Sequence, residues 1–356
     1  MSADAPRGSA AGPTPDAALT EVLDGGAARA AGLGADYGRL WSALTDASAG
    51  GKRFRPALVV TAHDLLGGHL PGPAARVGAA VELLHTAFVI HDDVIDGDHT
   101  RRGRPNVSGT FAAAATAAGA TPRGARTYAD TAGILAGDLA LVAAVRAVAC
   151  CGAPPATVER LLDLIDRTVH VTAAGELADV RLSLDLDDEH VPLGDVLTMC
   201  EHKTAVYSFE LPLQAGAVLA GAEETVVRRL GEIGRLVGIA FQLIDDLQGV
   251  FGDEAVTGKS ALTDLREGKH TPLIAHARST QAWEAIAPFF GDPALDEARA
   301  DRVRELLVDC GSRDFIEDLA AGYLDTALNV VRETGLPGEF LDGVVALTRD
   351  LLRRAA

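Results

Sequence analysis

Two clusters of aspartate stand at the ends of apolar stretches of the chain. The first ends the stretch VELLHTAFVIHDDVIDGD, residues 81–98, and contains Asp92, Asp93 and Asp96. Asp92 and Asp96 are four residues apart, so on a helix they lie on one face, one turn from each other. Carboxylates presented in this way suit Mg²⁺, which usually shares its coordination with substrate phosphates. The first cluster therefore predicts a magnesium–phosphate site.

The second cluster belongs to the stretch GRLVGIAFQLIDDLQGVFGD, residues 234–253, and contains Asp245 and Asp246. Several carboxylates at the end of a buried helix cost free energy unless water, basic side chains or a cation neutralises them. If the two helices lie opposite each other, this cluster supplies the facing metal ligands. The competing interpretation is a solvated rim of acids, and two clusters after apolar stretches of similar length make that less favourable.

Basic residues form two short segments, KRFR at 52–55 and RRGR at 101–104. Arg101 and Arg102 follow Asp92 by nine and ten residues, which brings their guanidinium groups near the first acidic cluster. Arginine binds phosphate through two parallel hydrogen bonds. Acids with adjacent arginines are consistent with a metal–diphosphate complex bound between them.

Helical periodicity continues from residue 16 to the end of the chain, interrupted only by short Gly/Pro segments. No alternating strand pattern competes with it, so we expect one all-α bundle domain over 16–356. Residues 1–15, rich in Gly, Ala, Ser and Pro, are expected to be disordered. The predicted helices span 16–31, 36–47, 55–67, 73–97, 125–149, 155–181, 193–200, 204–220, 223–250, 270–288, 294–310, 313–334 and 338–354.

Composition limits the partners. The net charge of -18 over 356 residues argues against nucleic acid and anionic membranes as partners, since either would be repelled by the surface as a whole. The four cysteines lack CxxC spacing, and free thiols in a reducing cytosol are expected. The N-terminus lacks the pattern of a signal peptide, and no stretch reaches 18 mainly apolar residues. These observations predict a cytoplasmic protein without an integral membrane segment.

Six motifs occur along the chain in a fixed order. They are GGKRFRP from Gly50, HTAFVIHDDVIDGDHTRRGRP at 85–105, GILAGD at 133–138, GELAD at 175–179, KT at 203–204, and FQLIDDLQGVFGDEAVTGKSALTDLREGKHTPL at 241–273. In this order they resemble the trans-isoprenyl diphosphate synthase family, also called polyprenyl synthetases, over nearly the whole chain. The resemblance implies an all-α bundle around a deep central cavity, a homodimer, and three magnesium ions per active site. The bacterial short-chain geranylgeranyl and farnesyl diphosphate synthases are the members most like it.

The resemblance also implies roles for individual residues. The magnesium ligands and the acids that support them would be Asp92, Asp93, Asp96, Asp245, Asp246 and Asp264. Of these, Asp246 and Asp264 would act through metal-bound waters or nearby lysines. The allylic diphosphate would be held by Lys203, Lys259, Lys269 and Arg101, and isopentenyl diphosphate by Lys52, Arg55, His85 and Arg102. Thr204 and Gln242 match polar residues that stabilise the developing carbocation.

The implied reaction is ionisation of an allylic diphosphate (dimethylallyl, geranyl or farnesyl), attack by the double bond of isopentenyl diphosphate, and loss of a proton. Product length depends on residues below the first aspartate motif. One helical turn is about 5.4 Å, roughly one isoprene unit. In the family, bulk at both positions corresponding to Ala87 and Phe88 accompanies C15 products. Small Ala87 beside Phe88 therefore favours C20, geranylgeranyl diphosphate, over C15, with Leu84 as a further candidate for the floor.

One position departs from the family pattern. The second motif is DDxxD in many members, but here Gly249 stands where the last acid is expected. The first two acids carry most of the expected ligation, so we expect activity to be retained. Asp253, one turn further on, is a candidate substitute.

Three other functions compete. A class I terpene cyclase shares the fold and the first acidic motif but has no use for GKRFRP and RRGRP. A metal phosphohydrolase with scattered His/Asp ligands would use His91 and Asp92 with His63 or His85. A non-catalytic partner subunit typically loses acids from its clusters, and only Gly249 points that way.

Overall fold

The computed structural model describes residues 13–184, 191–252 and 262–334, with residues 336, 338–339, 342–343 and 346. Its contacts divide the chain into two compact units. Unit 1 comprises Met1–His99 and Pro105–Glu159, and unit 2 comprises Thr100–Arg104 and Arg160–Ala356. Each unit is described here by itself.

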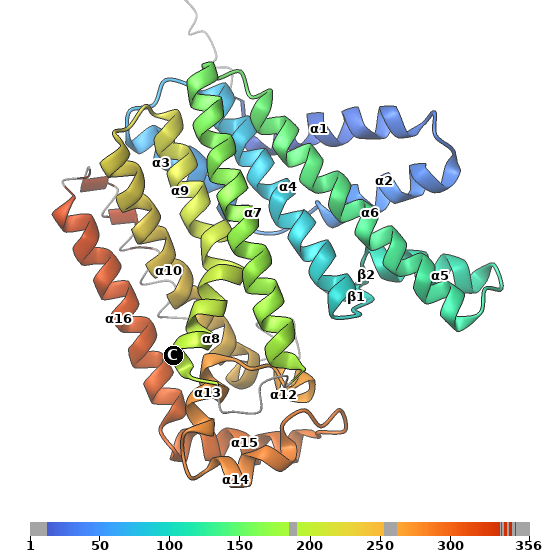
Figure 1. Ribbon diagram of the computed structural model, residues 1–356, viewed down its shortest axis with the longest axis vertical. Coiled ribbons are helices and arrows are strands. Elements are labelled where there is room, and N and C mark those ends of the chain that lie inside the picture. Colours follow the sequence, from blue (N-terminus) through green and yellow to red (C-terminus); the bar gives the residue numbers. More distant parts are fainter. Residues whose placement is uncertain are drawn as a thin grey trace, which may run out of the picture. The chain divides into compact units, whose positions relative to one another are not determined.

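Unit 1 is a bundle of six helices along its described residues. They are α1 (Pro15–Ala30), α2 (Ala35–Ala47), α3 (Phe54–Leu65), α4 (Pro71–Ile95), α5 (Val107–Ala117) and α6 (Pro122–Ala149). Figure 1 shows α4 and α6 running side by side, and α4 also packs against α1 and α3. Residues that favour a helix N-terminus mark the starts of these helices. Thr121, for example, is the N-cap of α6: its side chain accepts a hydrogen bond from the Gly124 amide, and Pro122 is the first residue of the helix.

The core of unit 1 gathers beside the last turns of α4. Trp41 and Leu44 of α2, Ala87 and Ile90 of α4, and Phe111 of α5 belong to one buried cluster. Because alanine is frequent on α4 and α6, the two helices approach closely, and large side chains from α2 and α5 fill the remaining space. This packing fixes the end of α4, where the first aspartate motif lies.

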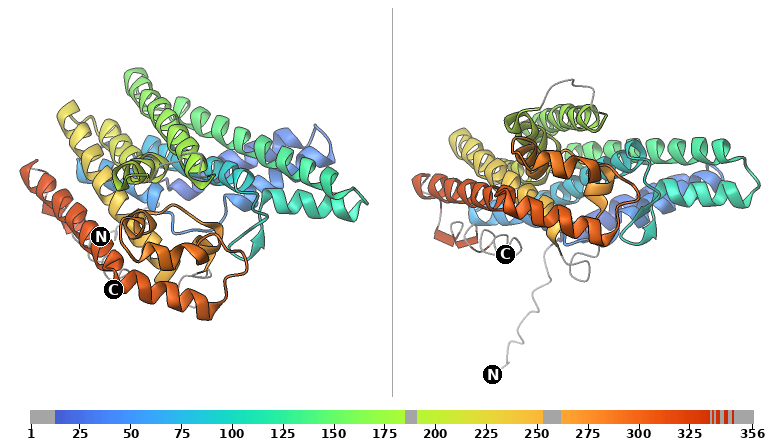
Figure 2. Two further views of the ribbon diagram at one scale, coloured as in Figure 1. Left: turned by 60° about the horizontal axis from the view of Figure 1, so that its bottom comes forward. Right: turned by 90° about the horizontal axis from the view of Figure 1, so that it is seen from below.

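Unit 2 combines long helices with several short ones. Its hairpin and first helices are β1 (Thr100–Arg101), β2 (Arg104–Pro105), α7 (Pro155–Ser183), α8 (Leu193–Cys200), the π-helix η1 (Glu201–Glu210), α9 (Leu211–Leu219) and α10 (Glu224–Phe251). The later elements are α12 (Thr263–Glu267), α13 (Pro272–Arg278), α14 (Trp283–Ile286), the 3₁₀-helix η2 (Ala287–Phe289), α15 (Glu297–Asp309) and α16 (Ser312–Glu333). Both views of Figure 2 show α10 and α16 side by side, and α10 also packs against η1 and α9. α10 is therefore the central helix of unit 2.

The all-α prediction is confirmed, since the described residues form helices apart from two strands of two residues each. Several boundaries were wrong. The helix predicted at 204–220 is part of a continuous run from α8 through η1 to α9, and the one predicted at 270–288 is broken into α13, α14 and η2. The helices α5 and α12 and the hairpin were not predicted. The helix predicted at 338–354 lies mostly outside the described residues.

The prediction that no stretch is apolar enough to span a membrane is wrong by length and composition. Among the described residues, α4 and α6 each contain an 18-residue window with mean hydropathy of 1.3 and 1.8 respectively. However, 72% of the α4 window and 44% of the α6 window are buried inside the structure. Two such helices are weak evidence for a membrane span, because the core helix of a soluble protein passes the same test.

Candidate active site

The first aspartate motif occupies the last turn of α4. Asp92 is half-buried, Asp93 is buried, and Asp96 is exposed as the C-cap residue of the helix. The backbone amide of Asp98 donates to the Asp93 carbonyl at 2.8 Å, which tightens the end of the helix. The C-terminal end of a helix carries partial negative charge and favours cations. Three carboxylates at this end repel one another, and a bound cation would relieve that repulsion.

Two glycines of the GILAGD motif set the distance between α6 and this end of α4. A Cβ on Gly133 would lie 2.2 Å from Val94 Cγ2, and one on Gly137 would lie 2.2 Å from His91 Nε2. A larger residue at either place would have to displace the Val94 or the His91 side chain. The motif is thus a contact surface for α4, and Asp138 Oδ1 lies 3.5 Å from His91 Nε2.

These contacts bear on the metal phosphohydrolase hypothesis. His91 lies against α6, with Nε2 3.4 Å from the Ile134 carbonyl. His63 is buried, its Nδ1 lies 2.7 Å from Asp64 Oδ1, and its Nε2 accepts a hydrogen bond from the Leu70 amide. Both imidazoles therefore have structural partners in unit 1, which argues against a His/Asp metal centre.

The GGKRFRP motif is a turn that leads into α3. Gly50 and Gly51 have φ of 77° and 82°, and Arg53 has φ of 50°, all in the left-handed region. Glycine reaches this region without steric cost, whereas arginine rarely does. The turn leaves Lys52 exposed and Arg55 half-buried at the start of α3. The left-handed arginine indicates that tertiary contacts hold the turn in place.

Arg53 supplies those contacts and was not among the predicted site residues. Its Nη1 lies 2.6 Å from Glu82 Oε1 on α4, and its Nη2 donates to the Ser48 carbonyl at 2.7 Å. Glu82 is buried, and it lies one turn before His85 on the same helix. The ion pair thus ties the basic turn to the helix that carries His85 and the first aspartate motif.

The RRGR segment is a hairpin turn between β1 and β2. Arg102 and Gly103, its two central residues, have φ of 53° and 70°. Positive φ at both central residues is the mark of a type I′ turn, the tight connection that matches the twist of the strands. The turn places Arg101 on β1 and Arg102 at the tip, so the two guanidinium groups leave the backbone at different points.

Lys203 and Thr204 lie on the π-helix η1, where both are half-buried. A π-helix is wider than an α-helix and is frequent at functional sites. Three glycines of other helices make room for it. A Cβ on Gly175 of α7 would lie 2.3 Å from the Lys203 nitrogen, and Cβ atoms on Gly234 and Gly238 of α10 would lie within 2.7 Å of η1 backbone or side-chain atoms.

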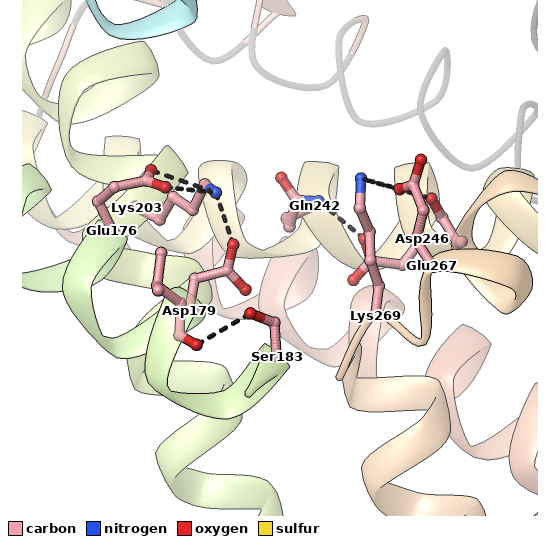
Figure 3. A network of polar contacts seen from close by, with 10 residues as sticks. Glu176, Asp179, Ser183, Lys203, Gln242, Asp246, Glu267 and Lys269 are labelled. Carbon is pink, nitrogen blue, oxygen red and sulfur yellow. Dashed lines mark hydrogen bonds and ion pairs between the residues drawn. The ribbon is translucent and has the colours of Figure 1, made fainter. Parts of the chain in front are cut away.

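The Lys203 ammonium lies between two carboxylates of the GELAD motif. Its Nζ is 2.6 Å from Asp179 Oδ2 and 3.2 Å from Glu176, as Figure 3 shows. Glu176 and Asp179 are three residues apart on α7, so they share the face that Gly175 brings against η1. Neither acid was predicted as a site residue, although the motif itself was recognised.

Two ion pairs of one arginine join the two ends of η1. Arg235 of α10 lies 3.5 Å from Glu201 and 3.5 Å from Glu210, the first and last residues of the π-helix. Glu210 is buried, and Arg167 lies 3.3 Å from its other oxygen. Burial raises the pKa of Glu210, and the two arginines oppose that rise. This pairing could not be predicted from the sequence, because its members come from three distant segments.

The second aspartate motif presents one exposed and one buried carboxylate on α10. Asp245 is exposed, whereas Asp246 is buried and its Oδ1 accepts a hydrogen bond from Gln242 Nε2 at 2.8 Å (Figure 3). Asp246 Oδ2 accepts no hydrogen bond from the described residues. Burial, with Asp264 and Asp245 adding to it, raises the pKa of Asp246. A buried oxygen without a donor fits a cation or the water bound to one.

Lys269, like Lys203, lies near two carboxylates. Its Nζ lies 3.2 Å from Glu267 Oε2 and 3.8 Å from Asp264 Oδ1. Asp264 stands in the first turn of α12. Two other predicted residues, Lys259 and Asp253, lie outside the described residues.

The residues proposed to limit product length lie on α4 below Asp92. Leu84 and Ala87 are fully buried, and Ala87 belongs to the core cluster with Trp41 and Leu44. Phe88, four residues before Asp92 and therefore on the same face, is half-buried. Of the three, only Phe88 retains exposed surface.

The chemistry of these acids fits magnesium. The described residues contain no group of three or more His, Cys, Asp or Glu side chains that could hold a metal ion unaided. Mg²⁺ is usually bound through one or two carboxylates together with substrate phosphates. The aspartate motifs, with the orphaned Asp246 oxygen, therefore suit a metal that arrives with a phosphate ligand.

Comparisons with known proteins agree with this chemistry. A family model described as polyprenyl synthetase matches residues 40–307. A geranylfarnesyl diphosphate synthase of Aeropyrum pernix is 32% identical over 80% of this chain and 83% of that protein. A geranylgeranyl diphosphate synthase of Methanosarcina mazei is 34% identical over 80% of this chain and 81% of that protein.

A solved structure extends the likeness to the fold. Geranylgeranyl pyrophosphate synthase from Corynebacterium glutamicum, complexed with isoprenyl diphosphate and magnesium, has a TM-score of 0.86 and 29% identity, and the match covers 96% of this chain and 98% of that one. The family resemblance and the isoprenoid synthase fold expected from the motifs are thereby confirmed. The chain belongs to the polyprenyl synthetase family of trans-prenyltransferases.

Proposed function

We propose that this protein joins isopentenyl diphosphate to an allylic diphosphate (dimethylallyl, geranyl or farnesyl) in a magnesium-dependent reaction and releases a short-chain all-trans prenyl diphosphate. The observation that carries the proposal is the end of α10. There the exposed Asp245 stands beside the buried Asp246, whose Oδ2 has no donor among the described residues. Membership of the family and the names of the relatives support the substrate class.

The allylic diphosphate is held where positive side chains meet the charge that develops on it. Lys203 and Lys269 in unit 2 and Arg101 on the hairpin donate to its oxygens, and negative charge grows on those oxygens as the bond to carbon breaks. The π-helix and the Glu176–Asp179 pair orient Lys203 before the substrate binds. Lys259 is proposed for the same role from its motif, outside the described residues.

The proposed metal ligands are Asp92, Asp96 and Asp245, with Asp246 and Asp264 acting through water. Three ions per site remain part of the proposal, and the magnesium in the Corynebacterium glutamicum relative supports the metal. When bound, magnesium neutralises the departing diphosphate.

Isopentenyl diphosphate is held by a separate set of basic residues. The proposed contacts are Lys52, Arg55, His85 and Arg102. Arg53 holds the turn that carries the first two, so its role is to position them. Thr204 and Gln242 present polar atoms to the allylic cation, which must be shielded from water until the new bond forms.

Geranylgeranyl diphosphate, C20, is the proposed product, and C15 farnesyl diphosphate is the alternative. Phe88 is the proposed floor of the pocket, because it shares the Asp92 face of α4 and is not fully enclosed in the core. Ala87 and Leu84 are fully buried in the core around α4, so they affect the position of α4 but have no exposed surface that could line a pocket. The relatives named above make products of more than one length, so product length rests on these residues alone.

Two further points of organisation belong to the proposal. The family match spans residues of both units, which supports one polyprenyl synthetase domain over 16–356. We also propose a homodimer that uses α6. Four large apolar side chains lie exposed on one face of that helix: Ile134, Leu135, Val142 and Val145. A second copy of the chain would bury them.

The test is an elongation assay with purified protein, Mg²⁺, labelled isopentenyl diphosphate and each allylic starter in a separate reaction. A dominant C20 product, abolished in Asp92→Ala and lengthened in Phe88→Ala, is expected. Asp309→Ala, an exposed aspartate at the end of α15, is the matched control and should elongate normally. No elongation with any starter would refute the proposal, and release of a cyclic hydrocarbon without consumption of isopentenyl diphosphate would replace it with terpene cyclisation.

A further inference from the structure

The helical register of η1 determines which way Lys203 points. A π-helix, with its i→i+5 hydrogen bonds, has about 4.4 residues per turn, against about 3.6 in an α-helix. If η1 changed to the α register, Lys203 would rotate about a third of a turn relative to Glu210, seven residues further on. Its ammonium would then leave Glu176 and Asp179 on α7. Whatever holds the π register therefore also positions Lys203.

η1 needs support from its neighbours, because π-helices usually extend for a single turn, whereas this one covers ten residues. α10 contacts it at the spacing of a π-helix. A Cβ on Gly238 would lie 2.5 Å from Ala205 Cβ, and one on Gly234 would lie 2.7 Å from Glu210 Cα. Ala205 and Glu210 are five residues apart, which is about one π turn. The face of η1 that packs against α10 thus follows the π register.

Arg235, next to Gly234 on α10, contacts both ends of η1. Its Nη1 lies 3.5 Å from Glu201 Oε1, and its Nε lies 3.5 Å from Glu210 Oε2. The two acids are nine residues apart, which is about two full turns of a π-helix but about two and a half turns of an α-helix. They share a face in the π register and lie on opposite faces in the α register. One arginine can therefore reach both acids only while η1 is a π-helix.

The two ends of η1 are held differently. Glu210 is buried, and Arg167 of α7 lies 3.3 Å from its Oε1, so this end has an anchor besides Arg235. Glu201 is half-buried, and its ion pair with Arg235 joins the first turn of η1 to α10. Lys203 lies in that first turn, two residues after Glu201. The ion pair of Arg235 with Glu201 is thus the contact that bears most directly on Lys203.

We propose that Arg235 is a positioning residue that holds η1 in the π register and thereby directs the Lys203 ammonium to the diphosphate site. The inference rests on the proposed function and adds to it a residue that lies outside the six sequence motifs. Arg235 acts through its pairs with Glu201 and Glu210. Its removal should loosen η1 and, through Lys203, weaken diphosphate binding.

The experiment combines hydrogen–deuterium exchange of residues 201–210 with calorimetric titration of the full-length protein by inorganic diphosphate and Mg²⁺. In Arg235→Gln and in Glu201→Gln, the η1 amides should exchange about 10-fold faster or more. Diphosphate affinity should fall about 10-fold, the effect of losing one charge-assisted hydrogen bond from Lys203. Glu201→Gln leaves no buried charge unpaired, so it should fold even if Arg235→Gln does not. Arg229→Gln, an arginine of α10 paired with Glu232 on the same helix, is the matched control.

Two double variants separate positioning from general stability. Glu201→Gln should have no further effect once Arg235→Gln is present, and Arg235→Gln should weaken diphosphate binding no further in Lys203→Ala. Native exchange rates of η1 in both single variants would overturn the inference. So would an equal loss of diphosphate affinity with and without Lys203, since Arg235 would then not act through the lysine.

The proposed function fails separately from this inference. If the native protein binds magnesium diphosphate and the variants show these effects, but no allylic starter is elongated, the role of Arg235 stands and the reaction is wrong. Thermal unfolding of each variant checks that a difference in binding does not come from loss of the fold.

Discussion

Replacement of Asp179 by asparagine tests whether the GELAD acids act through Lys203. The change keeps the shape of the side chain and removes the charge that lies 2.6 Å from the Lys203 ammonium. A hydrogen bond between charged groups contributes about 1.5 to 3 kcal/mol, and the exposed fractions of the two side chains, 22% and 31%, reduce this to about 1 to 2 kcal/mol. We expect kcat/KM for the allylic diphosphate to fall about 5- to 30-fold.

The assay is steady-state elongation with the allylic starter varied, in the native background and in Lys203→Ala. If Asp179 works only by placing the ammonium, Asp179→Asn costs nothing further once Lys203 is absent. Glu176→Gln should show the same pattern with a smaller loss, because its distance is longer, at 3.2 Å. Asp166→Asn, an exposed acid on α7, is the matched control. Equal losses in both backgrounds, or tighter allylic binding in Asp179→Asn, would refute the reasoning.

Three other perturbations test the framework around the site. Arg53→Ala leaves the buried Glu82 charge unpaired, so the free energy of unfolding, measured in urea, should fall by about 3 kcal/mol. The KM for isopentenyl diphosphate should rise more than the KM for the allylic diphosphate. If the ratio of these two KM values did not change, Arg53 would not position the isopentenyl diphosphate site. Burial raises the pKa of Glu210 above its ordinary 4.5, so its contribution to stability is fully present below pH 4.5 and is lost as pH rises through the higher folded-state pKa. In Glu210→Gln, the free energy of unfolding, measured in urea at a series of pH values, should decline less steeply with pH. An unchanged slope would mean that Glu210 does not cause the decline. Val142→Glu places a charge on the exposed face of α6 and should convert the proposed dimer to a monomer in light scattering, whereas persistence of the dimer would assign the interface elsewhere.

The elements that the sequence predicted well are those whose signals are local. α10 was expected at 223–250 and spans Glu224–Phe251, because one apolar face repeats along it. α5 was missed because its sequence, VSGTFAAAATA, has no charged residue and is rich in alanine, so no clear apolar periodicity is visible. The π-helix was missed because Gly175, Gly234 and Gly238, which make room for it, are distant from it in sequence.

The same distinction holds within the candidate site. The aspartate motifs could be located from the sequence because their acids are neighbours on one helix turn. The partners of Lys203 could not, since they depend on the contact of Gly175 with η1. Gly249 shows the difference most clearly. In the sequence it replaces an expected acid, but in the structure the Asp264 carboxylate of α12 occupies the space that a side chain at position 249 would need.

The charge balance around the lysines supports the proposal that a metal accompanies the substrate. Lys203 has two carboxylates within 3.2 Å, and Lys269 has two within 3.8 Å. Each lysine with its pair of acids therefore carries a net negative charge, and such a group does not attract a diphosphate anion by itself. A divalent cation reverses the balance, because it satisfies the aspartates and neutralises the phosphates together. In the proposed reaction the lysines then orient a neutralised complex, and a diphosphate that arrives without a metal would be repelled.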